Sequence, residues 1–376
     1  MEELAEIIAF DFDDAEGLPK LNSSWRWGDK EQALLSSCSS LIAIVGAEGS
    51  RVVQFSHFSV REFLTSPRLG SSNGDISYYH VDLEPAHTIL AQACLSMLLQ
   101  LDDRVEKDGV QQSLPLVQYA AEHWASHAQF KDVSTRIHKG MEYLFDPDKP
   151  HFSVWLQLHD IDTDAQWETE FFEFTIRDKS IAGPLYYASL CGFHDLARHL
   201  ISQYPEYVNA RGGHFVTPLV AALSRKHFHT AELLHRNGAD PNVRGFKQRT
   251  PLHSVVVAYH GGHQMVEELI KYNADVNARN IWSETPLMNA AWKPTPDCHD
   301  VVQFLLDHGA NVNSRSDYTT ALHGAVIEGS LDVVRSLLEH GADVGAKNNE
   351  GETPLQIGSK KNSDEIMELL RGHSAM

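Results

Sequence analysis

The sequence is short of cysteine and of long apolar runs. Only 4 of its 376 residues are Cys. Cys38, Cys94, Cys191 and Cys298 stand far apart and form no Cys-X-X-Cys pair, which indicates reduced thiols packed as small apolar groups. The longest apolar run, near residues 41–46, is too short to cross a bilayer. The acidic N-terminus also lacks a signal-peptide pattern. We expect a soluble protein of the cytoplasm or nucleus that does not enter the membrane.

Basic residues are also scarce. The chain has 31 Lys and Arg against 51 Asp and Glu, so its formal net charge is −20, and both halves are acidic. Binding to a nucleic-acid backbone needs clustered Lys and Arg. The composition therefore argues against nucleic acid as a partner and favours a basic peptide or a basic protein surface.

Motifs for catalysis and for phosphate or metal binding are missing. No G-x-x-x-x-G-K-[ST] loop and no Gly-x-Ser-x-Gly elbow occurs, and the glycines of residues 46–50 have no Lys to reach a phosphate. His123 and His127 have the spacing of a zincin pair, but Trp124 occupies the position of the required Glu. Cys298 and His299 lack a placed base. We expect no enzymatic activity, no cofactor and no metal.

What the chain does have is a repeated pattern, Thr-Pro-Leu-X-X-Ala, in its second half. Counted at the second position of the pattern, six copies lie 34, 33, 35, 35 and 33 residues apart. A period of about 33 residues is typical of a stacked array that binds another macromolecule. The copies begin at Gly183, Thr217, Thr250, Thr285, Thr320 and Thr353.

Local rules predict the structure of each copy. Thr before Pro caps a first helix, and Pro at the first helical position loses no needed donor. A second helix follows with an apolar stripe, as in Val333, Val334, Leu337 and Leu338. A Gly then supplies the left-handed residue that ends this helix. A Val-Asn pair leads into a projecting turn.

This pattern resembles the ankyrin repeat over residues 181–376, with the first copy degenerate and the last suited to a terminal cap. The resemblance implies a mainly α solenoid of two-helix units. Its first helices and loop tips would form a concave face that binds a protein partner.

Departures from the pattern indicate where that partner binds. The third and fourth copies carry extra residues at 257–263 and 292–299. The nearby loop tips, where polar residues are usual, contain aromatic residues. Aromatic and Arg side chains are preferred interface anchors. An alternative interpretation is that Trp282 and Trp292 fill the space left by the insertions. We predict a binding surface centred on Phe246, Lys247, Tyr259, Trp282, Trp292, Lys293 and Tyr318.

The first half reads as two further segments. In residues 1–70, expected helices at 1–10, from 29 and from 59 accompany two strands, 41–45 and 52–55, which suggests a winged-helix domain. Residues 71–180 suggest a helical connector. Its apolar faces include Ile89, Leu90 and Cys94 in one helix, and Tyr119 and Trp124 in another.

Residues 1–130 resemble the region that follows the NTPase module in fungal NACHT–ankyrin proteins of the STAND class. The motifs that carry the resemblance include Leu35–Leu41, Phe55–Leu64 and Tyr119–Trp124. Such proteins couple ligand detection by repeats to NTPase oligomerisation in signalling. Because the phosphate-binding loop is missing, either an NTPase lies upstream or the chain is a relative reduced to sensor and linker.

We therefore expect a non-catalytic scaffold or sensor that binds a protein partner. The alternative is the regulatory part of a NACHT-type NTPase switch.

Overall fold

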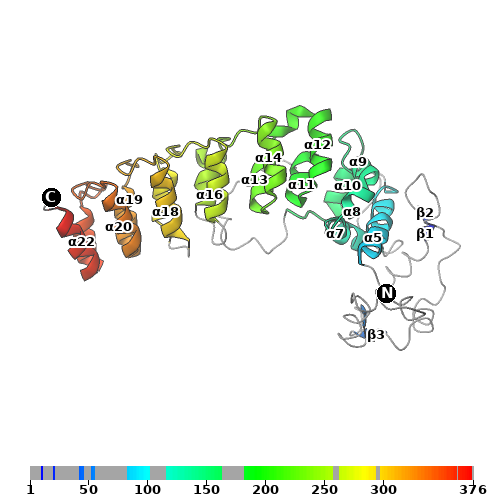
Figure 1. The fold of residues 1–376 in the computed structure, drawn as a ribbon, viewed down its shortest axis with the longest axis horizontal. Coiled ribbons are helices and arrows are strands. Elements are labelled where there is room, and N and C mark those ends of the chain that lie inside the picture. The colour runs from blue at the N-terminus through cyan, green and yellow to red at the C-terminus, as the bar shows by residue number, and fades with distance from the viewer. Residues whose placement is uncertain are drawn as a thin grey trace, which may run out of the picture. The chain divides into compact units, whose positions relative to one another are not determined.

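A computed structural model describes residues 10–11, 20–21, 42–45, 52–55, 83–101, 116–162, 182–256, 262–293, 297–361 and 363–374. It is mainly helical and divides into two compact units, Met1–Ile161 and Asp162–Met376 (Figure 1). The sequence-based boundary between connector and repeats falls within residues 163–181, outside the described residues.

The first unit contains two short antiparallel strand pairs. β3 (Ile42–Val45) pairs with β4 (Val52–Phe55), as the two expected strands predict. β1 (Phe10–Asp11) pairs with β2 (Lys20–Leu21), so Phe10 is in a strand and not at the end of the expected first helix. The remaining parts of the expected winged helix lie outside the described residues.

Helices of the first unit surround an aromatic core. Trp124 and Trp155 meet edge to face at 5.3 Å, and Trp155 Nε1 donates to the carbonyl of Ala121 at 3.0 Å. Ile89, expected on the apolar face, is 43% exposed. The buried positions Thr88, Ala91, Leu95 and Leu98 recur at helical spacing and leave Ile89 beside that face. The helices are α5 (Leu83–Leu98), α7 (Leu116–Ala128), α8 (Val133–Arg136), α9 (His138–Leu144) and α10 (His151–Leu158).

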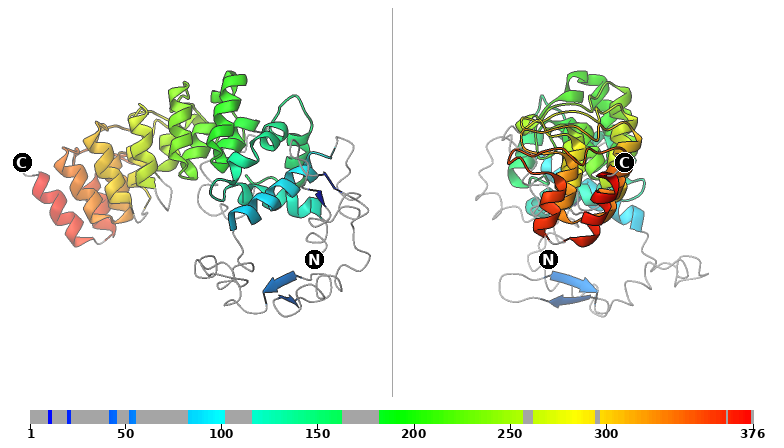
Figure 2. Two further views of the ribbon diagram at one scale, coloured as in Figure 1. Left: turned by 45° about the vertical axis from the view of Figure 1, so that its right-hand side comes forward. Right: turned by 90° about the vertical axis from the view of Figure 1, so that its left-hand side faces the viewer.

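The second unit is a stack of helix pairs (Figure 2). In most neighbouring pairs the first helix packs on the first helix of the next pair, and the second helix on the second. Among the described residues the pairs are α11 (Pro184–Cys191) with α12 (His194–Gln203), α13 (Pro218–Ser224) with α14 (Phe228–Arg236), α15 (Pro251–Val255) with α16 (Gly262–Lys271), α17 (Pro286–Ala291) with α18 (Cys298–Asp307), α19 (Ala321–Glu328) with α20 (Leu331–Glu339), and α21 (Pro354–Lys361) with α22 (Asp364–Ser374). Short 3-10 turns, η4 (Pro205–Asn209) and η5 (Phe246–Gln248), lie in connecting segments.

The predicted helix signals are confirmed. Thr217 and Thr285 each precede a helix that begins at Pro. Their side chains accept hydrogen bonds from the backbone amides of Val220 and Met288, respectively. Gly309 follows α18 at φ +86°, a left-handed conformation that glycine adopts without strain. The apolar stripe of the last-but-one copy, Val333, Val334, Leu337 and Leu338, is buried as expected, whereas Leu233 and Ile270 in the second helices of earlier copies are only half-buried.

An asparagine ladder links consecutive repeats. Asn277 Nδ2 donates to the carbonyl of Gly309 at 3.0 Å, and its Oδ1 accepts from the amide of Asn311 at 2.8 Å. One side chain thus satisfies two backbone groups of the next repeat. Equivalent pairs of bonds are made by Asn209, Asn242 and Asn313.

Between consecutive repeats, a loop precedes each first helix and projects from the stack. The finger loops (residues 242–250, 277–285 and 313–320) are joined by backbone bonds. Ile281 N donates to Lys247 O at 3.0 Å, and Asp317 N donates to Trp282 O at 3.1 Å. A row of guanidiniums adds further links, each donating to a carbonyl of the following repeat: Arg244 to Arg279, Arg279 to Arg315, and Arg315 to Lys347.

His253 is the third residue of α15 and completes a buried capping box with Thr250 at the start of that helix. Its Nδ1 accepts from the hydroxyl and amide of Thr250, and its Nε2 donates to the carbonyl of Glu284 in the next repeat at 3.0 Å. His323 likewise contacts the Thr320 hydroxyl through Nδ1 and the carbonyl of Glu352 through Nε2. Both histidines thus have a structural role, because each links the start of its helix to the next repeat. Burial is the main cause that lowers the pKa of His253, to about 4.

Removing one rung of the asparagine ladder should destabilise the stack. We expect Asn277→Ala to lower the free energy of unfolding by about 1–2 kcal/mol, because two hydrogen bonds are lost. Asn237→Ala is the matched control, since its side chain bonds only to Leu233 within its own repeat. Urea denaturation followed by circular dichroism measures both. Equal effects of the two variants would contradict the ladder's role.

Acid should destabilise the repeats through His253. An unfolded His takes up a proton near pH 6.5, whereas folded His253 does so near pH 4. The unfolded state therefore binds more protons between these values, and stability falls as the pH drops through this window, by up to about 3 kcal/mol. We expect His253→Gln to reduce the slope of unfolding free energy between pH 6.5 and 4. An unchanged slope would contradict this account.

Candidate partner-binding site

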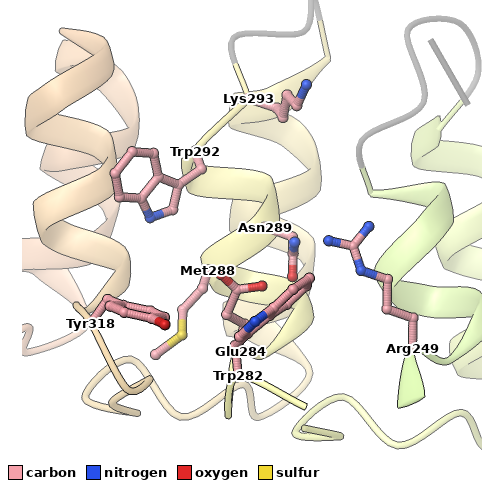
Figure 3. Close-up of a pocket in the computed structure, with 8 residues that line it drawn as sticks. All are labelled: Arg249, Trp282, Glu284, Met288, Asn289, Trp292, Lys293 and Tyr318. Carbon is pink, nitrogen blue, oxygen red and sulfur yellow. The ribbon is translucent and has the colours of Figure 1, made fainter. Parts of the chain in front are cut away.

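A pocket of about 340 Å³ opens on the face formed by the first helices and the finger loops. Helix α17 supplies its centre, loop 277–285 and loop 313–320 supply aromatic side chains, and residue 249 reaches it from the preceding repeat (Figure 3). It is lined by Arg249, Trp282, Glu284, Met288, Asn289, Trp292, Lys293 and Tyr318.

Trp282 is held at the tip of its finger loop by the loop's own hydrogen bonds. Its amide donates to Asn280 Oδ1 at 2.9 Å, and its carbonyl accepts from Asp317. Two cations face the half-buried ring: Lys247 Nζ lies 4.6 Å from the ring centroid and Arg249 Cζ lies 5.7 Å away. These cation–π contacts fix the ring on the site side of the loop.

Trp292 ends α17 at the point where the insertion begins. In Figure 3 its ring points from the helix end toward the neighbouring repeat. A Cβ placed on Gly324 of α19 would lie 2.6 Å from Trp292 Cδ1, so only glycine leaves room for the indole. Trp292 thus fills space between repeats and also lines the pocket.

Tyr318 is the most exposed aromatic of the pocket lining, at 53% of its surface. Its carbonyl accepts from the amide of Asn349 at 2.9 Å, so the backbone that carries it is fixed. Together with Trp292 it also lines an adjacent pocket of about 280 Å³ near Glu350 and Glu352.

The centre of the pocket is polar. Asn289 is 8% exposed, and its Oδ1 has no hydrogen-bond partner among the described residues. Arg249 is also buried at 8% exposure. Burial lowers the pKa of its guanidinium, while the carboxylate of Glu284 raises it. Glu284 in turn accepts from Asn280 Nδ2 at 2.7 Å.

The structure brings together most of the predicted site residues. Trp282, Trp292, Lys293 and Tyr318 line one pocket, and Lys247 contacts Trp282. Phe246 begins η5, and its side chain lies outside the described residues, as does all of Tyr259.

Four lining residues were not in the predicted set. Met288 and Asn289 occupy the two variable positions of Thr-Pro-Leu-X-X-Ala. The polar Asn289 at one of these positions was the signal in the sequence that could have indicated the site. Arg249 and Glu284 immediately precede the Thr of two copies; Glu284 shares the loop of Trp282, whereas the approach of Arg249 to Trp282 depends on how the repeats stack.

The sites that the sequence argued against have ordinary structural surroundings. His127 contacts His87 through the two Nδ1 atoms at 2.8 Å and Tyr119 through Nε2 at 2.8 Å. Within the described ranges, no three His, Cys, Asp or Glu side chains come together to hold a metal ion. Burial raises the pKa of Cys94 and Cys191 to about 12 and also raises that of Cys298, so the thiols stay protonated at neutral pH. No helix among the described residues has the length and apolar content needed to span a bilayer.

Comparison with known sequences identifies the repeats. Residues 219–316 match the ankyrin-repeat family in its three-copy form, and residues 305–357 match the many-copy form. Residues 219–357 are therefore ankyrin repeats, and the helical stack is an ankyrin-repeat solenoid. Such repeats imply a role in protein–protein interaction.

Several known proteins are similar over part of the chain. The azaphilone pigments biosynthesis cluster protein L of Monascus ruber is 28% identical over 63% of this chain and 52% of its own length. Ankyrin repeat protein FPV031 of fowlpox virus is 33% identical over 41% of this chain and 47% of its own. This chain thus spans about half the length of these two relatives. The crystal structure of an ankyrin repeat domain from Acinetobacter baumannii aligns with a TM-score of 0.45 and 28% identity, covering 51% of this chain and 97% of that one.

The contact between Trp292 and Gly324 gives a testable coupling. Alanine is a better helix former than glycine by about 1 kcal/mol, so Gly324→Ala in α19 should stabilise the protein when nothing obstructs the new methyl group. Trp292 obstructs it in the natural protein. We expect Gly324→Ala to be neutral or destabilising alone and stabilising in a Trp292→Ala background. Unfolding free energies of the four proteins test this, and additive effects would contradict the contact.

Proposed function

We propose that this chain is a non-catalytic binding protein that holds a protein partner on the face formed by its first helices and finger loops. The centre of the surface is the pocket between Trp282, Trp292 and Tyr318, with Lys247 and Lys293 beside it. The arrangement of three aromatic side chains around one open pocket supports this proposal most directly.

Exposure and rigidity both support a binding role. Tyr318 is 53% exposed and the neighbouring loop residue Ile281 is 52% exposed, although apolar groups of this size gain by leaving water. The loops that carry them are joined by backbone hydrogen bonds. A partner therefore meets side chains on a surface that is already ordered, and less entropy is lost on binding.

Substitution of the exposed tyrosine tests the proposal. We expect Tyr318→Ala and Trp282→Ala to reduce partner recovery in affinity capture by about tenfold or more, as loss of a central aromatic anchor does. Tyr143→Ala is the matched control, because Tyr143 on α9 is 55% exposed but lies in the first unit. Circular dichroism checks that each variant is folded. The proposal is wrong if both folded site variants keep every partner of the natural protein.

A second candidate function is the sensor part of an NTPase switch of the NACHT type. The match to the Monascus ruber relative covers 63% of 376 residues, or about 237 residues, whereas residues 181–376 number 196. It therefore includes residues before the repeats, which supports a shared arrangement of helical segment and repeats. An in-frame phosphate-binding loop upstream of residue 1 would distinguish a switch from an independent binding module.

A further inference from the structure

The finger loops differ in charge from the rest of the molecule. The three loops contain five cations, Arg244, Lys247, Arg249, Arg279 and Arg315, against two anions, Glu284 and Asp317, in a chain of net charge −20. Lys293 adds a further cation at the pocket. Exposed charges more than about 8 Å away are largely screened at physiological salt. The net positive charge of the loops therefore decides which charged groups the site attracts. This charge is opposite in sign to that of the whole chain.

The pocket offers apolar, cationic and hydrogen-bonding groups within one small volume. Its 340 Å³ is at the lower end of ligand pockets, which fits one large side chain better than a cofactor. Trp282 and Trp292 provide aromatic walls. Lys247 and Arg249 lie against Trp282, and the Oδ1 atom of Asn289 has no hydrogen-bond partner among the described residues.

We propose that the pocket binds an acidic peptide segment of the partner, with one aromatic side chain of that segment inserted between Trp282 and Trp292. Flanking carboxylates of the peptide pair with Lys247 and Lys293, and a peptide N–H donates to Asn289 Oδ1. This inference rests on the proposed function and specifies the chemistry of the partner. It replaces the basic partner that the total charge of the sequence favours.

Single-stranded nucleic acid also combines negative charge with flat rings, but the site suits it less well. A strand carries a phosphate at each nucleotide and needs a continuous cationic groove. Arg244, Arg279 and Arg315 already donate to backbone carbonyls. The adjacent pocket carries Glu350 and Glu352 as well as Lys360 and Lys361, so it does not extend the site as a uniformly cationic groove.

Labelled synthetic peptides test the inference on the full chain by fluorescence anisotropy. The probes share one phenylalanine in a short sequence and differ only in whether glutamate, glutamine or lysine flanks it. A fourth probe, oligo-uridylate, represents single-stranded nucleic acid. We expect the glutamate peptide to bind about tenfold more tightly than the glutamine peptide, with the lysine peptide weakest and the oligonucleotide weaker than the glutamate peptide.

Charge reversal in the protein provides the matched variants. Lys247→Glu and Lys293→Glu should each weaken binding of the glutamate peptide about fivefold and improve binding of the lysine peptide. Lys139→Glu on α9 makes the same change in net charge at an exposed position of the first unit and should have no effect.

Absence of binding by the glutamate peptide, equal affinities of the three peptides, preference for the lysine peptide, or tighter binding of oligo-uridylate would overturn the inference. Such results would leave the proposed function intact as long as Tyr318→Ala still loses captured partners. Loss of the Tyr318 effect would instead contradict the proposed function itself.

Discussion

Across the described repeats, one repeat completes backbone hydrogen bonds of the next, and this constraint governs the second unit. The turn before each finger loop leaves an amide and a carbonyl that the asparagine of the preceding repeat bonds, as Asn277 does for Gly309 and Asn311. Most first helices likewise pack on the next one. Stability is therefore shared between neighbours, and a change at one rung affects two repeats.

The same constraint places the candidate site. Backbone bonds between finger loops set Trp282 beside residue 317, and therefore beside Tyr318, although the two aromatics are 36 positions apart in the sequence. Trp292 enters the same pocket only because Gly324 on the next first helix leaves space for its ring. The site is thus a property of stacked repeats, since residues from three of them line it.

Much of the repeat architecture could be predicted because its signals are local. A Thr-Pro pair fixes the start of a helix, and a glycine such as Gly309 fixes the end. The exposure of Ile89 could not be predicted, because it depends on which side of α5 faces its neighbours. Arg249 was missed in the site for the same reason: its approach to Trp282, on the next finger loop, is set by contacts between repeats.

The composition and the structure differ most in the charge that they indicate: the whole chain is acidic, whereas the finger loops are basic. Arg244, Arg279 and Arg315 use their guanidiniums to bond carbonyls of the following repeat, yet each keeps its positive charge. The residues that fasten the loops together also make the loops basic. An acidic protein can therefore carry a row of basic loops, since hydrogen bonding to neutral carbonyls fixes these cations in place without neutralising them.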